Sequence, residues 1–84
     1  MKVALKLYAT LSDYLPAEAQ KSNRLDLDVE PGTTPLMLIE RFALPQKICH
    51  LVLIDGVFVP PGMRASRVLE EGEVLAIWPP VAGG

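Results

Sequence analysis

An α+β fold, in which one main amphipathic helix covers one face of a mixed β-sheet, is predicted by three observations on this 84-residue sequence. Two segments alternate apolar and polar side chains, which is typical of strands with one buried face. Residues 36–44 repeat apolar side chains at three- and four-residue steps, which is typical of a helix. An Asp-Gly pair lies between two short apolar runs, the composition of a tight hairpin turn.

The first element is a strand over residues 2–8, with Val3, Leu5 and Leu7 facing inward. The same alternation places Tyr8 on the side of the lysines, toward solvent.

Residues 11–15 then carry apolar side chains at helical spacing for about one turn, which Pro16 ends. The stretch PAEAQKSN, residues 16–23, reads as a loop. Residues 24–30, RLDLDVE, alternate leucine or valine with charged residues, which predicts a second strand with its carboxylates on a solvated face. The connection is too short for a crossover helix, so we expect the two strands to pair antiparallel.

The main helix follows the turn PGTTP, with Thr33 or Thr34 as N-cap and Pro35 at the first helical position. Its expected apolar face consists of Leu36, Ile39, Phe42 and Ala43. The residues expected to point outward are Met37, Glu40 and Arg41. We expect Pro45 to end this helix.

Residues 51–59, LVLIDGVFV, predict a hairpin that turns at Asp55-Gly56. After a turn at Glu71-Gly72, the segment EVLAIW forms the last strand, which Pro79 and Pro80 end because neither can donate a ladder hydrogen bond. This order of elements matches a β-grasp, or ubiquitin-like, roll, in which the first and last strands are parallel neighbours.

This order of elements divides the chain into a domain and a tail. We expect residues 1–78 to form the β-grasp domain and residues 79–84 to form an extended Gly-Gly tail that leaves from the middle of the sheet.

Composition excludes several classes of function. The formal net charge is -2 and the pI is near 5.2, which gives no long-range attraction to nucleic acid or to anionic membranes. The single cysteine rules out an internal disulfide. No segment approaches the roughly 20 apolar residues that span a bilayer. A soluble cytoplasmic protein is expected.

No internal group of residues suggests catalysis. Cys49 and His50 are adjacent beside a strand, and neighbouring strand residues point to opposite faces, so we expect a buried thiol and a surface imidazole. One cysteine and one histidine cannot make a closed zinc site, so no metal is expected. Glu70, Glu71 and Glu73 flank a turn and are expected to be solvated. No phosphate-binding glycine motif is present, so no cofactor is expected and any ATP must be held by a partner.

What remains is the terminal carboxylate of Gly84, an anion at neutral pH and a poor electrophile. An ATP-dependent partner could convert it to an acyl adenylate, which a sulfur nucleophile would convert to a thiocarboxylate. Gly83 and Gly84 have no side chain and could enter a narrow channel. Pro79 and Pro80 stiffen the segment, and PPVAGG reaches roughly 20 Å when extended. The alternative is that the prolines merely end the strand and the glycines form a frayed end.

The terminus PPVAGG, the preceding turn of Leu69, Gly72, Glu73 and Val74, and the opening KVALKLYATLSDYL resemble the small subunit of molybdopterin synthase. This family consists of ubiquitin-like sulfur carriers and is related to the carrier of thiazole biosynthesis. The resemblance implies that a ubiquitin-activating-like adenylyltransferase activates Gly84. It also implies that the tail then donates sulfur to a pterin precursor inside the large subunit, in a heterotetrameric synthase. Gly83 and Gly84 match the family's functional dipeptide.

The same resemblance implies a docking surface. In the family, aromatic or apolar residues on the exposed sheet face contact both partners, and their matches are Tyr8, Phe58 and Trp78. Core packing is the alternative role for all three, and the last strand is apolar at both parities around Trp78. The arm expected to enter the partner consists of Pro79, Pro80, Val81 and Ala82.

Other functions remain open at the level of sequence. Pro60-Pro61-Gly62 is closer to the thiazole carriers, so the carrier could serve thiazole or another thiolated metabolite. A protein modifier would form isopeptide bonds through the same adenylate, with an amine as nucleophile. A plain interaction domain would have an inert tail.

Overall fold

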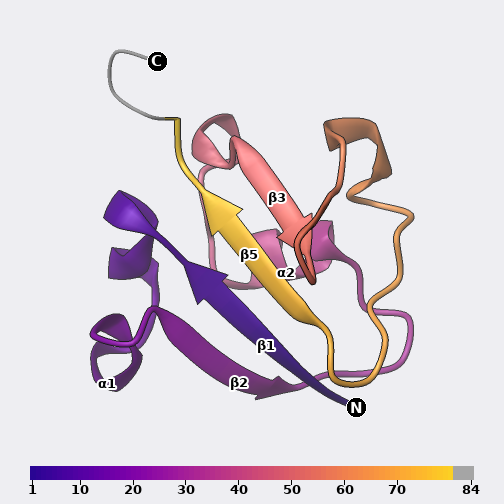
Figure 1. Ribbon diagram of the computed structural model, residues 1–84, viewed down its shortest axis with the longest axis horizontal. Coiled ribbons are helices and arrows are strands. Elements are labelled where there is room, and N and C mark those ends of the chain that lie inside the picture. Colours follow the sequence, from indigo (N-terminus) through magenta and orange to yellow (C-terminus); the bar gives the residue numbers. More distant parts are fainter. Residues whose placement is uncertain (81–84) are drawn as a thin grey trace.

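The computed structural model describes residues 1–80 and has a five-stranded mixed sheet with one main helix behind it (Figure 1). The elements in chain order are β1 (Lys2–Leu7), η1 (Ala9–Tyr14), α1 (Ala17–Gln20), β2 (Arg24–Asp28), α2 (Pro35–Arg41), η2 (Gln46–Ile48), β3 (Leu51–Ile54), β4 (Val57–Phe58), η3 (Pro61–Met63) and β5 (Val74–Trp78). This is the expected α+β, β-grasp architecture. Within residues 1–80 no helix is long and apolar enough to cross a membrane.

The strands lie in the order β2-β1-β5-β3-β4. β1 pairs antiparallel with β2 and parallel with β5, as the sequence predicts. β5 also pairs antiparallel with β3, so it has a neighbour on each side. Because β5 is the middle strand, the chain beyond Trp78 leaves from the centre of one end of the sheet (Figure 1).

The core lies between the sheet and α2. In β1, Val3, Leu5 and Leu7 are buried as expected, and α2 contributes Leu38 and Ile39. The strands β3 and β5 add further fully buried side chains, which are Val52, Ile54, Leu75 and Ile77. Burying a single side chain of this kind contributes about 1.5–3 kcal/mol, so the inward parity of each strand is strongly fixed.

α2 begins as predicted and ends earlier. The Thr34 hydroxyl accepts the Met37 backbone N–H at 3.3 Å, and Pro35 is the first helical residue. The helix stops at Arg41 because Ala43 adopts a left-handed φ of 55°. The Leu44 N–H then donates to the Ile39 carbonyl at 2.9 Å, which is the bond of a Schellman C-cap.

The predictions for α2 are confirmed in part. Ile39 is buried, Phe42 packs against the core, and the side chains expected to point outward are exposed. Two predictions are wrong, since Pro45 does not end the helix and Ala43 is exposed, and Leu38 is a buried residue that the predicted face left out. The helical periodicity predicted a buried Ala43, but the helix ends at Arg41, so residue 43 no longer follows the helical spacing.

The expected loop over residues 16–23 is also wrong in part, since it contains the single-turn helix α1. Ala19 is buried and anchors this turn to the core. One buried side chain in an otherwise polar segment is too weak a pattern to predict a helix. In the hairpin, by contrast, Asp55 and Gly56 both have positive φ, 49° and 83°, as a tight two-residue turn requires.

Candidate docking face and the root of the C-terminal tail

The face of the sheet opposite α2 is a candidate docking surface. Strand alternation places the neighbours of the core residues on this side. We call it the open face, and it comprises Ala4 and Lys6 of β1, Val74, Ala76 and Trp78 of β5, Leu51 and Leu53 of β3, and Phe58 of β4, with Tyr8 just after β1. Its β5–β3–β4 side is apolar, whereas β2 contributes Arg24, Asp26 and Asp28 at the opposite edge.

Tyr8 and Trp78 form one stacked unit on the open face. Their ring centroids are 3.7 Å apart and their planes differ by 3°. The Tyr8 N–H donates to the Ile77 carbonyl at 3.2 Å, which extends the β1–β5 pairing by one step and brings the rings together. The Lys6 ammonium lies 5.8 Å from the centre of the Tyr8 ring, within cation–π range.

Trp78 lies on the surface, with 38% of its area exposed, and Tyr8 is partly exposed. Both residues predicted to dock partners at this end of the sheet are therefore outside the core. The His50 N–H donates to the Trp78 carbonyl at 3.0 Å, so the backbone at the end of β5 is held from both sides.

Phe58 lies on the same face but apart from the stack. It pairs with Leu53, which pairs in turn with Ala76, so two strand spacings, about 10 Å, separate Phe58 from β5. Half of its surface is exposed. Phe58 and Trp78 thus mark two ends of an apolar strip whose middle is Leu51 and Leu53.

Leu51 and Leu53 are candidate contact residues that sequence reasoning missed. Leu51 is 36% exposed and pairs with Trp78, and Leu53 is partly buried. In the run LVLI both parities are apolar, so periodicity does not say which residues face outward. The Asp55-Gly56 turn was the available signal, because it fixes the register of the hairpin and so places Leu53 on the same face as Phe58.

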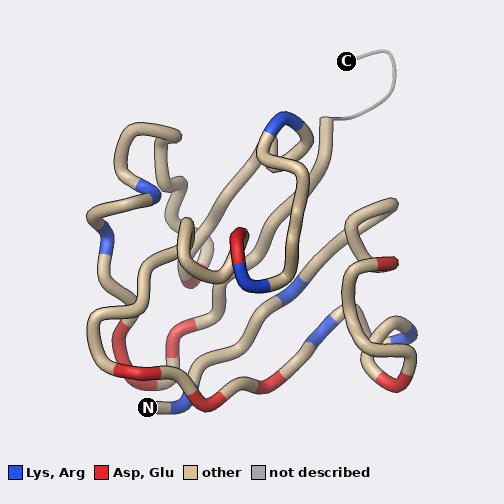
Figure 2. The backbone as a smooth tube through the Cα atoms, turned by 180° about the vertical axis from the view of Figure 1, so that it is seen from behind, with Lys and Arg blue, Asp and Glu red and all other residues tan. Residues whose placement is uncertain are grey.

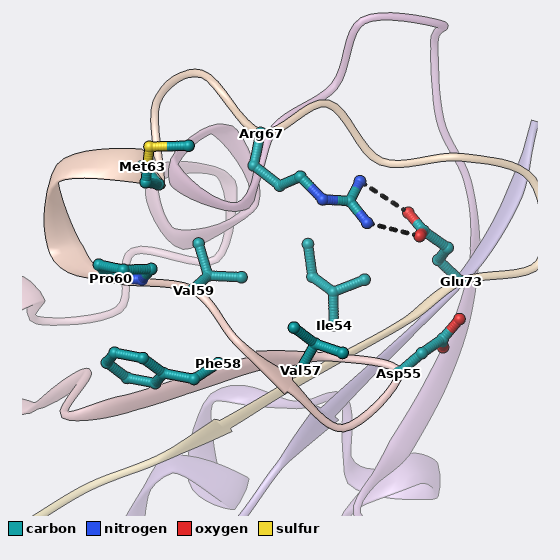
Figure 3. Close-up of a pocket in the computed structure, with 9 residues that line it drawn as sticks. All are labelled: Ile54, Asp55, Val57, Phe58, Val59, Pro60, Met63, Arg67 and Glu73. Carbon is teal, nitrogen blue, oxygen red and sulfur yellow. Dashed lines mark hydrogen bonds and ion pairs between the residues drawn. The ribbon is translucent and has the colours of Figure 1, made fainter.

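A hollow of about 250 Å³ lies beside Phe58 (Figure 3). Its apolar wall consists of Ile54, Val57, Val59, Pro60 and Met63. One end is closed by Arg67, whose guanidinium donates two hydrogen bonds to Glu73, at 3.1 and 2.7 Å. This paired contact links two residues of the irregular segment that runs from η3 to β5.

The expectation that Glu73 is solvated is wrong. Its side chain is only 14% exposed. It also accepts the Glu70 backbone N–H at 2.7 Å. The hydrogen bonds from Arg67, the larger effect, hold the pKa of the Glu73 carboxyl below its ordinary value, against the opposing effect of burial. Sequence alone could not pair Glu73 with Arg67, since an irregular segment connects them.

Cys49 and His50 differ in burial, as predicted, with a buried thiol and a surface imidazole. Cys49 is buried, its thiol donates to the Pro45 carbonyl at 3.4 Å, and burial raises the pKa of that thiol. His50 is exposed. A buried thiol with a raised pKa is a poor nucleophile at neutral pH. Among residues 1–80 there is no cluster of three or more potential metal ligands.

The root of the tail is described and its tip is not. Pro79 is partly buried and Pro80 is exposed at the end of β5. The remaining predicted tail residues, Val81, Ala82, Gly83 and Gly84, lie outside the described residues.

The sheet order, the single main helix and the parallel β1–β5 pair define a small protein of the ubiquitin-like class. Its sequence matches no family model and no curated protein. Solved structures with a similar fold include SAMP1 from Haloferax volcanii, with a TM-score of 0.67, 21% identity and full coverage of both chains. They also include a putative molybdopterin converting factor, subunit 1, from Pyrococcus furiosus, with a TM-score of 0.59 and 19% identity over 95% of this chain and 98% of that one. The likeness expected from the sequence is confirmed at the level of the fold.

Proposed function

We propose that this chain is a sulfur carrier whose terminal Gly84 is adenylated and then converted to a thiocarboxylate. The observation that supports it most is the position of β5. The middle strand delivers Trp78, Pro79 and Pro80 to one end of the sheet, beside the aromatic stack on the open face. A partner that docks on the open face would therefore lie where the chain continues toward its terminus.

The proposed chemistry uses the terminal carboxylate and a partner's ATP. A Gly84 oxygen attacks the α-phosphorus of ATP, pyrophosphate leaves, and an acyl adenylate forms on the chain. A persulfide sulfur then attacks the Gly84 carbonyl and AMP leaves; reductive cleavage of the sulfur–sulfur bond by a thiol leaves the thiocarboxylate. The adenylyltransferase supplies the nucleotide site, and this chain supplies the docking face and the reacting carboxylate.

The proposed acceptor of the sulfur is a pterin precursor in molybdopterin synthesis, with this chain as the non-catalytic small subunit of a heterotetrameric synthase. The tail motif PPVAGG supports this choice, and so does the fold likeness to the putative molybdopterin converting factor, subunit 1. The large subunit would bind the open face and accept the tail. Pro60-Pro61-Gly62 supports thiazole or another thiolated metabolite as the alternative acceptor.

A protein modifier is the second candidate function, and the likeness to SAMP1, a ubiquitin-like small archaeal modifier, favours it. It shares the adenylate with a sulfur carrier and differs in the nucleophile, which would be a lysine amine. The open face and the tail root suit both functions, because each requires an activating partner.

Intact mass spectrometry separates these functions. The full chain is incubated with a competent adenylyltransferase, ATP, a persulfide donor, a thiol reductant and a mixture of lysine-bearing proteins. A sulfur carrier gains the mass of one oxygen-to-sulfur exchange, located in the C-terminal fragment. A modifier gives higher-mass adducts joined through Gly84. If neither product forms with an enzyme that activates a known carrier in parallel, both proposals are overturned.

A further inference from the structure

A second cavity, of about 370 Å³, lies behind the open face between η2, the start of β3 and the segment that follows η3. Its lining includes Lys47, Cys49, His50 and Arg64, together with the neutral residues Leu36, Gln46, Pro61 and Ala65. None of the proposed docking aromatics lines this cavity. The charged side chains of this lining are not used in the function proposed above.

Arg64 is the unusual member of this lining because it is a cation with only 9% of its surface exposed. One guanidinium Nη donates to the His50 carbonyl at 3.3 Å. Its Nε is buried and has no hydrogen-bond partner within residues 1–80. A buried guanidinium with five N–H donors is destabilising unless hydrogen bonds or a counter-charge compensate it.

Among residues 1–80, the lining of the cavity supplies no counter-charge. The cavity lining contains Lys47 and Arg64 but no aspartate or glutamate, and none of the ion pairs among the described residues includes Arg64. The chain as a whole carries a formal charge of -2, so this local excess of positive charge is not a general property of its surface. Figure 2 shows the acidic positions mainly in the lower part of the tube, away from the end where the chain leaves β5.

The backbone keeps Arg64 in place. Its carbonyl accepts the Leu36 N–H at 3.0 Å at the start of α2, and its own N–H donates to the Pro61 carbonyl at 3.4 Å. The charge is thus presented by a fixed segment, and an incoming ligand would not have to order it.

We propose that this cavity binds an oxyanion, a carboxylate or a phosphate group, between Arg64 and Lys47. Guanidinium groups match the planar or tetrahedral oxygens of these anions with paired hydrogen bonds. The cavity reaches the tail root through His50, whose N–H donates to the Trp78 carbonyl. An anion bound there would lie behind the residues that end β5. The proposal does not rest on sulfur carriage and could hold in a chain that carries no sulfur.

Proton–nitrogen correlation spectra of the full-length protein test this site, because the Arg64 Nε–H gives a signal of its own. Inorganic phosphate and sodium acetate are the two probes, each compared with sodium chloride at equal ionic strength. We expect a saturable shift of the Arg64 Nε–H signal with at least one probe and none with chloride. Saturation by phosphate alone assigns a phosphate ligand, and saturation by acetate assigns a carboxylate.

Two lysine variants test the site without unfolding the protein. Arg64 is buried, so we expect Arg64→Gln to destabilise the chain, whereas Lys47 is exposed and Lys47→Gln should leave the fold intact. We expect Lys47→Gln to weaken binding of the probe about threefold. The matched control is Lys21→Gln, at an exposed lysine outside the cavity, which should leave the affinity unchanged. Absence of a saturable shift with both probes, or equal losses in the two variants, would overturn the proposal.

Discussion

The indole of Trp78 lies flat on the phenol ring of Tyr8, with 3.7 Å between ring centroids. The stack joins the last residue of β5 to the residue that follows β1, and these strands are parallel neighbours. It covers one face of the indole and fixes its orientation while leaving 38% of Trp78 exposed. A partner would therefore meet an ordered aromatic surface at the root of the tail, at little cost in side-chain entropy.

Trp78→Ala should weaken partner binding more than it weakens the fold. Besides the apolar area that the side chain buries, the substitution removes a surface stack, which contributes about 0.5–1.5 kcal/mol to the free energy of unfolding. An aromatic anchor at an interface costs about 2 kcal/mol or more of binding free energy when it is truncated. Calorimetric titration with the adenylyltransferase and urea unfolding measure the two quantities.

The control for that substitution is Val68→Ala. Val68 is an exposed apolar residue outside the sheet, so its loss should affect neither quantity strongly. A Trp78→Ala chain that binds normally but unfolds much more easily would assign Trp78 to the core and remove it from the docking face.

Glu73→Gln should lower stability at neutral pH by about 1 kcal/mol, and the difference from the native chain should vanish in acid. The folded-state pKa of Glu73 lies below its ordinary value of 4.5 because Arg67 donates to the carboxylate. The stabilisation is therefore complete above about pH 4.5 and is lost as the pH falls through the lower folded-state pKa.

Urea unfolding of both chains at a series of pH values measures this difference. Glu40→Gln, on the exposed side of α2, is the control and should show no such pH dependence. A stability difference that stays constant down to low pH would mean that the Arg67–Glu73 contact does not depend on the charge of Glu73.

Ala43→Gly should stabilise the protein by about 0.5–1 kcal/mol, although glycine usually weakens helices. Ala43 has a left-handed φ of 55° and is exposed, so glycine relieves strain without loss of packing. Thermal or urea unfolding checks this. In the hairpin, the opposite change, Gly56→Ala, should destabilise the protein by about 1 kcal/mol, because φ there is 83°, a conformation that alanine rarely adopts. The space around an added Cβ is open, so the cost comes from the backbone conformation and not from a clash. A destabilised Ala43→Gly chain would indicate that the helix continues to Pro45.

The first two strands were predictable because each alternates apolar and polar side chains, so that one face is clearly the buried one. Leu25, Leu27 and Val29 alternate with charges, and the partner strand alternates in the same way, so pairing and facing follow from the sequence. The end of α2 was not predictable, since a left-handed alanine gives no signal of the kind that glycine gives. A four-residue helix such as α1 is too short to show a period.

The sequence predicted the candidate site only where strand alternation shows which side chains face outward. Alternation placed Tyr8 outside, and the structure adds that it stacks on Trp78, which depends on the register between strands far apart in sequence. The Arg64 cavity gave one usable signal, the segment RASR, which has two cations and no acid. That arginine could be recognised as buried only after the chain was folded, because burial of Arg64 depends on η2 and α2 packing around it.

The most direct measurement of the central claim is ATP–pyrophosphate exchange with the full chain and with a chain that lacks Gly84. The terminal carboxylate of Gly84 is proposed to react while the domain is held together by residues before the tail. We therefore expect exchange that depends on the full chain, no exchange with the deletion, and identical unfolding curves for the two proteins. Undiminished exchange with the deletion would contradict the role of Gly84, and a loss of cooperative unfolding would contradict the separation of tail and domain.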